Sequence, residues 1–90
     1  MKHSKGVKKA DIKLFALSTC IWCRKTKALL DELGVDYNYV DVDLTEGEES
    51  ERVRQEMSRW NPKISFPTLV LNNEKCIIGF DEQAIRDSLK

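Results

Sequence analysis

Two cysteines separated by two residues, Cys20 and Cys23, are the side chains in this sequence best suited to chemistry. They come directly after an apolar segment that predicts a buried strand over residues 11–17, and they begin a predicted helix over 20–33. Free N–H groups and the dipole at a helix N-terminus favour the thiolate form of Cys20, and Arg24 and Lys25 add positive charge nearby. Cys23 lies one turn further in, so we expect it to be less exposed. An attacking thiolate and a resolving thiol are the two parts of disulfide exchange.

A structural zinc site is the main alternative for a C-x-x-C pair. Such sites need four ligands, and only Cys76 and His3 remain as further candidates. His3 lies in a segment that we expect to be unstructured, so we predict no metal site. Cys76 falls within a predicted strand, where a free cysteine is more often a small buried hydrophobe than a regulatory thiol.

Length and composition indicate one small globular domain. The chain has 90 residues, of which 41% are hydrophobic and 33% are charged, and its formal net charge is zero. This balance gives no reason to expect nucleic-acid or membrane partners, and no apolar segment reaches the ~18 residues of a membrane span. Three cysteines without an export signal do not make a disulfide framework, which favours a reducing cytoplasm.

The first ten residues differ in composition from the rest. Residues 1–10 contain four lysines and no acid, so residues 11–90 carry 11 basic and 15 acidic side chains. A polar segment of this kind cannot bury enough apolar surface to fold by itself. We predict a basic flexible tail over 1–10, in preference to a nucleic-acid-binding arm, followed by one domain over 11–90.

The remaining patterns predict the element order β-α-β-α-β-β-α. Gly34 ends the first helix, and strand, helix and strand together have the length of a right-handed βαβ unit with parallel strands. Thr45 and Glu48 have capping-box spacing at the start of a second helix that runs to about Trp60. Asn72 and the residues after it predict the turn of a hairpin. The predicted strands cover 11–17, 37–42, 68–71 and 75–78, and a last helix follows Asp81.

Pro67 stands just before the third predicted strand. It is either an ordinary edge-strand proline or the site of a cis peptide bond that shapes a turn near the cysteines. The residues alone leave both interpretations open.

Three motifs in this order, the C-x-x-C pair, Phe66-Pro67-Thr68 and Gly79-Phe80-Asp81, resemble those of the glutaredoxin family. The resemblance covers about residues 11–90. It implies an α/β, thioredoxin-like fold with a four-stranded mixed sheet in the order 2-1-3-4 and helices on both faces. It also implies that Pro67 is cis and abuts Cys20, that Phe66 offers backbone hydrogen bonds to a bound thiol peptide, that Cys20 is the nucleophile and that Cys23 is the resolving thiol.

The sequence departs from the family pattern at several positions. Ile21 and Trp22 replace the usual Pro-Tyr, Leu17 stands where a lysine often pairs with the glutathione carboxylate, and Phe80 replaces the second glycine of a Gly-Gly pair. Asp81 remains, either as a ligand of the γ-glutamyl amine or as a helix cap. The candidate substrate-binding residues are Thr19, Trp22, Lys63, Phe66, Pro67, Gly79, Phe80 and Asp81.

These features predict a monomeric, cytoplasmic dithiol–disulfide oxidoreductase that acts on disulfide-bearing proteins or small disulfides. It needs no organic cofactor, because thiols carry the exchange. The expected reductant is thioredoxin reductase, glutathione or another low-molecular-weight thiol. Two alternatives are an iron–sulfur cluster module that bridges two subunits and a thioredoxin-fold interaction domain without turnover.

Overall fold

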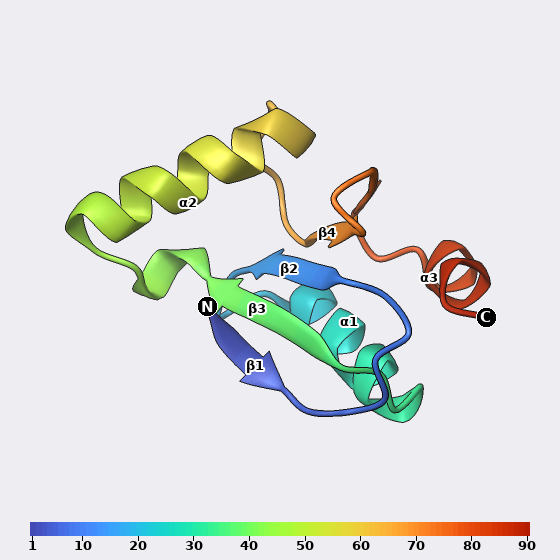
Figure 1. The fold of residues 1–90 in the computed structure, drawn as a ribbon. Helices are drawn as coiled ribbons and strands as arrows, with labels where there is room; N and C mark the ends of the chain where they lie inside the picture. Colours follow the sequence, from blue (N-terminus) through green and yellow to red (C-terminus); the bar gives the residue numbers. More distant parts are fainter.

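A five-stranded sheet with helices on both faces forms the molecule, as described by a computed structural model of residues 1–90 (Figure 1). The strands lie in the order β1-β3-β2-β4-β5. Along the chain the elements are β1 (Lys2–Ser4), β2 (Ile12–Ala16), α1 (Ile21–Glu32), β3 (Tyr37–Asp41), the short 3₁₀ helix η1 (Val42–Leu44), α2 (Gly47–Trp60), β4 (Thr68–Leu71), β5 (Lys75–Ile78) and α3 (Glu82–Ser88).

The centre of the sheet has the predicted pairing. β2 is parallel to β3 and antiparallel to β4, and β4 and β5 form an antiparallel hairpin. The βαβ unit ends its helix at Gly34, whose φ of +68° is the left-handed conformation that glycine adopts without strain. The thioredoxin-like α/β prediction is therefore confirmed.

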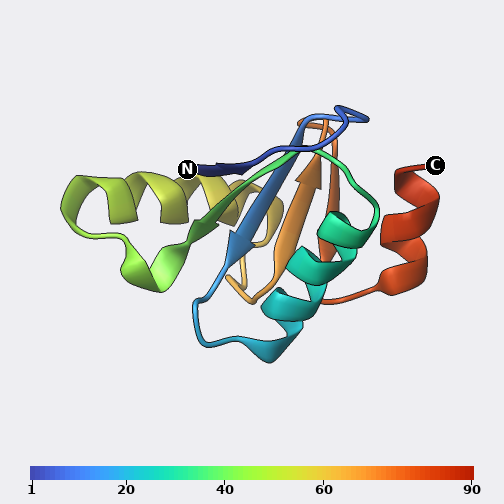
Figure 2. The same cartoon turned by 90° about the horizontal axis from the view of Figure 1, so that it is seen from below.

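Alternation along β2 divides the core into two clusters. Ile12, Leu14 and Ala16 face α1 and α3, where the larger cluster lies. Phe15 faces the opposite side and packs in a smaller cluster with Met57 of α2. Figures 1 and 2 show this arrangement, with α1 and α3 on one face of the sheet and α2 on the other.

The prediction of four strands and of an unstructured tail needs correction. Lys2–Ser4 form β1, which adds a fifth strand antiparallel to β3, beside the four strands that have the expected order. Further along, Val7 N donates to Gly34 O at 2.7 Å. A Cβ on Gly6 would meet the backbone of Val35 at 2.5 Å, so only glycine permits this close approach. The segment has no apolar pattern because backbone hydrogen bonds and the Asp36 carboxylate, which contacts His3 and accepts from Gly6 N, hold it in place of burial.

The predicted capping box at Thr45 and Glu48 is also wrong. Helix α2 begins at Gly47, and its N-cap residue, Glu46, makes no side-chain capping bond. The Thr45 hydroxyl instead donates to Val42 O at 2.6 Å, within the 3₁₀ turn that precedes the helix. None of the three α-helices has the length and apolar character required to cross a membrane.

Candidate active site

The sulfur of Cys20 caps helix α1. Cys20 is the N-cap residue with extended backbone angles, and its Sγ accepts a hydrogen bond from Cys23 N at 3.2 Å. Ser18 and Thr19, the polar residues just before Cys20, do not fill that role. This N–H points at the Cys20 sulfur, which is the atom that would carry the negative charge of a thiolate.

The second cysteine lies in a different environment. Cys23 is completely buried, whereas Cys20 is partly exposed, and both are free thiols. Burial, together with the adjacent Cys20 sulfur, raises the pKa of Cys23 to about 12. Cys23 is therefore a protonated thiol at neutral pH, and Cys20 is the only member of the pair that solvent reaches.

A carboxylate from a distant segment holds the loop that leads to Cys20. Asp43 of η1 accepts a hydrogen bond from Ser18 N at 2.8 Å and a second from the Ser18 hydroxyl. These bonds lower the pKa of Asp43 from its usual value. No sequence spacing links Asp43 to Ser18, so this contact could not be predicted from the residues alone.

We expect the Asp43→Asn variant to be less stable than the parent at pH 7 and to lose less stability in acid. Since the folded state lowers the Asp43 pKa, its stabilisation is present above the unfolded pKa of ~4 and is lost as pH falls through the folded value. Urea unfolding at pH 7, 5 and 3 would measure this, with Glu74→Gln as an exposed control. Parallel pH profiles for Asp43→Asn and the parent would contradict the prediction.

Five of the predicted substrate-binding residues meet beside the cysteines. Trp22, Phe66, Pro67, Gly79 and Phe80 line a hollow of about 210 Å³. The Phe66–Pro67 peptide bond is cis, and Gly79 N donates to Pro67 O at 2.8 Å, which joins the two segments. The three motifs, far apart in the sequence, therefore form one surface.

Aromatic rings make up much of that surface. The rings of Trp22 and Phe80 stack with centroids 6.0 Å apart, and the Lys25 ammonium lies 4.7 Å from the Trp22 ring centroid. Trp22 is 54% exposed and its neighbour Ile21 is 63% exposed. Large apolar side chains left this open beside an accessible thiol are typical of a binding surface.

Three candidate residues lie outside the hollow. Thr19 and Lys63 are exposed and do not line it. Asp81 caps α3, where its carboxylate accepts from Ala84 N at 3.1 Å. The structure thus shows the helix-cap role of Asp81, which was one of its two interpretations.

Asn61, the residue that follows α2, was not among the site residues predicted from the sequence. Its buried amide nitrogen is within hydrogen-bond distance of Ser65 O, Ser65 Oγ and Thr68 Oγ1, at 3.2, 2.9 and 3.0 Å. Thr68 Oγ1 in turn donates to Ser65 O. This network encloses the loop that carries Phe66 and Pro67. The only sequence feature at Asn61 is its place between the helix end and Pro62, and that feature predicts the end of a helix but not a hydrogen-bond network.

The remaining thiol stands apart from this site. Cys76 lies in β5 opposite Val70, is only partly buried, and has a pKa that burial raises. No group of three or more His, Cys, Asp or Glu side chains is placed to hold a metal ion. Chemically, the site combines one accessible thiol, one buried thiol and an aromatic surface.

Comparisons with known proteins agree with this geometry. The family model described as Glutaredoxin matches residues 12–77. A curated relative from Clostridium pasteurianum, an uncharacterized glutaredoxin-like 8.6 kDa protein in the rubredoxin operon, is 30% identical over 74 residues, which are 82% of this chain and 91% of the relative. Methanosarcina acetivorans methanoredoxin is 52% identical with a TM-score of 0.90, covering 93% of this chain and 88% of its own. The glutaredoxin from Methanosarcina mazei Go1 is 51% identical with a TM-score of 0.91, and the match covers 98% of this chain and 85% of that glutaredoxin.

Proposed function

Because this chain belongs to the glutaredoxin family, we propose that it is a dithiol–disulfide oxidoreductase that reduces protein disulfides through Cys20 and Cys23. The observation that carries the proposal is the contrast between the two thiols. Cys20 is accessible at a helix N-terminus, and Cys23 is buried one turn behind it with a raised pKa.

The reaction proceeds in two exchanges. The Cys20 thiolate attacks one sulfur of the substrate disulfide, which forms a mixed disulfide and releases the other sulfur as a thiolate. The Cys23 sulfur then attacks Cys20, its proton leaves, and the second substrate sulfur departs. Two electrons have passed to the substrate, and Cys20 and Cys23 are joined as a disulfide that an external thiol or reductase reduces.

The order of these steps follows from the electrostatics. The Cys20 sulfur is one of the causes that raise the pKa of Cys23. Once Cys20 is bonded to substrate it carries no charge, so this contribution disappears. Burial, the largest cause of the raised pKa, remains, but loss of the Cys20 contribution lowers the pKa of Cys23 after the first exchange, as a resolving thiol requires.

The hollow supports a peptide substrate. Neither the N–H nor the C=O of Phe66 has a hydrogen-bond partner within the chain, so both are available to an extended peptide beside Pro67. Trp22 and Phe80 offer apolar contact on either side of that backbone. We propose proteins with an apolar residue next to a disulfide as the substrate class, and the reducing cytoplasm as the compartment.

The electron source is the second part of the proposal. Leu17 and Phe80 occupy positions where glutathione contacts are expected in the family, so we propose thioredoxin reductase, or a thiol other than glutathione, as the reductant. The decisive assay measures NADPH oxidation with a protein disulfide and thioredoxin reductase, or with glutathione and its reductase. Equal rates with and without glutathione at saturating thioredoxin reductase support the proposal, and strict glutathione dependence would overturn it. No turnover with any thiol, or a brown purified protein, would overturn the oxidoreductase assignment itself.

We expect the Trp22→Ala and Phe80→Ala variants to reduce a protein disulfide about tenfold more slowly in kcat/KM, because each removes an aromatic contact with the peptide. A small disulfide such as hydroxyethyl disulfide does not reach these contacts, so its rate should change less than about twofold. Leu44→Ala, which truncates an exposed apolar residue in η1 outside the hollow, is the control. Equal losses on both substrates would refute a role in peptide binding.

A further inference from the structure

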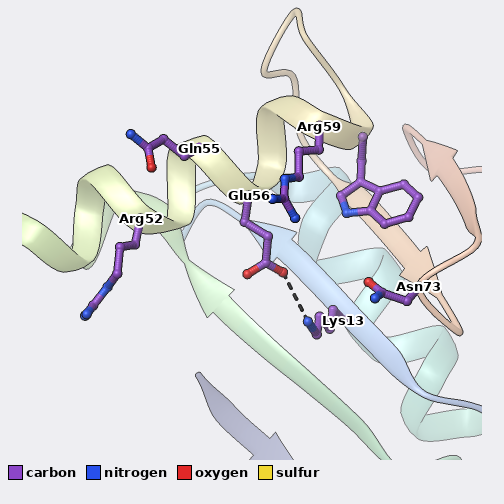
Figure 3. Close-up of a pocket in the computed structure, with 7 residues that line it drawn as sticks. Lys13, Arg52, Gln55, Glu56, Arg59 and Asn73 are labelled. Atoms are coloured by element: carbon purple, nitrogen blue, oxygen red, sulfur yellow. Dashed lines mark hydrogen bonds and ion pairs between the residues drawn. The ribbon is translucent and has the colours of Figure 1, made fainter.

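A second hollow, of about 390 Å³, lies on the opposite part of the molecule between helix α2 and the sheet (Figure 3). All but one of its seven lining residues are polar or charged, so a ligand there is held by charge and hydrogen bonds. They are Lys13, Arg52, Gln55, Glu56, Arg59, Trp60 and Asn73.

This hollow is separate from the thiol site. It shares no residue with the hollow beside the cysteines. Lys13 lies near the beginning of β2, whereas Cys20 follows the end of that strand, and Asn73 belongs to the turn between β4 and β5. The redox chemistry proposed above therefore makes no use of it.

The charges in this hollow are unbalanced. It has three cationic side chains and one carboxylate. The carboxylate of Glu56 is already paired with the Lys13 ammonium at 3.2 Å, as the dashed line in Figure 3 marks. Arg52 and Arg59 make no ion pair or side-chain hydrogen bond within the chain. Two guanidinium groups thus remain available to an anion.

The spacing of the two arginines selects the kind of anion. Arg52 and Arg59 are two turns apart on one face of α2, a rise of about 10 Å along the helix axis. An anion with charge at more than one position can pair with both guanidinium groups, whereas a compact monovalent ion can pair with one. Guanidinium groups bind phosphate oxygens in a planar, two-pronged manner.

We propose that this hollow binds a diphosphate-bearing small molecule through Arg52 and Arg59. The Trp60 indole and the Asn73 amide also line the hollow, so a planar base would find a ring to stack on and a polar partner there. Figure 3 shows Asn73 on the opposite side of Lys13 from Arg52. Free pyrophosphate and a nucleoside diphosphate share the phosphate chemistry, and the test below distinguishes them.

The test is a titration of the full chain at low ionic strength with pyrophosphate, ADP or adenosine, monitored by calorimetry and tryptophan fluorescence. Trp22→Phe is used as background so that fluorescence reports on Trp60 alone, since the chain has two tryptophans. We expect saturable binding of pyrophosphate and ADP that weakens as salt is raised. Tighter binding of ADP, with a change in Trp60 emission, identifies a nucleotide, and equal affinities identify the free diphosphate.

Charge variants decide whether the site is the one proposed. Arg52→Gln with Arg59→Gln should weaken binding by about tenfold per arginine. Arg24→Gln with Arg54→Gln removes the same charge outside the hollow and should leave affinity within about twofold. Glu56→Gln should strengthen binding, a gain that misfolding cannot produce. No saturable binding of either diphosphate, equal weakening by both double variants, or binding of adenosine alone would overturn the proposal.

Discussion

Replacing Cys20 with serine is expected to lower disulfide reduction by at least about 1,000-fold, because a serine hydroxyl without a general base is a poor nucleophile. Cys23→Ser should behave differently, since Cys20 can still attack. That variant should form the mixed disulfide and stop there, because no second thiol displaces the substrate. Mass spectrometry of each variant after incubation with a protein disulfide would show a covalent adduct with Cys23→Ser and none with Cys20→Ser.

The difference in exposure between Cys20 and Cys23, together with the raised pKa of Cys23, also predicts which thiol is alkylated. Burial and the adjacent Cys20 sulfur hold the pKa of Cys23 far above neutral, so its thiol stays protonated at pH 7. Burial adds a steric barrier, so iodoacetamide at neutral pH should label Cys20 and leave Cys23 unmodified until the chain is unfolded. Peptide mapping of the labelled protein measures the site directly.

Cys76 supplies the control for both experiments. It is partly buried on β5, and burial raises its pKa, so Cys76→Ala should retain turnover and Cys20 labelling. Labelling of Cys23 before Cys20, or a stable adduct formed by Cys20→Ser, would reverse the assignment of nucleophile and resolving thiol.

Loss of the Asn61 side chain is expected to destabilise the fold by about 2–4 kcal/mol, a large part of the ~5–15 kcal/mol typical of a domain. Asn61→Ala removes the donor to the Ser65 and Thr68 acceptors and leaves a cavity at a position that is 2% exposed. Urea unfolding measures the free energy difference.

Asn61→Ala is also expected to affect the active site. The Asn61 network holds the loop that carries Phe66 and Pro67, so Asn61→Ala should also slow reduction of a protein disulfide while Cys20 alkylation keeps its rate. Asn38→Ala, in a half-buried strand position without a side-chain hydrogen bond, is the matched control. A free energy of unfolding within about 0.5 kcal/mol of that control would contradict the importance of the network.

Local patterns predicted the elements that position the thiols. The apolar residues of β2 and the glycine stop after α1 are signals within a few residues of one another, and they report burial and backbone geometry directly. The capping box at Thr45 failed because the Thr45 hydroxyl satisfied a carbonyl of the preceding turn instead. A local motif indicates a helix start only when its side chains have no closer partner.

Local sequence patterns were enough to predict a C-x-x-C pair at a helix start after a buried strand, and the order of the main strands and helices along the chain, because these features depend on neighbouring residues. Only the tertiary structure decided the rest. Strand β1 pairs with β3 through backbone groups that have no residue signature. The Asp43–Ser18 bonds and the joining of Pro67 to Gly79 link segments that are distant in sequence. Such contacts arise from the packing of the whole chain, because their free energy exists only once the sheet has brought both partners together.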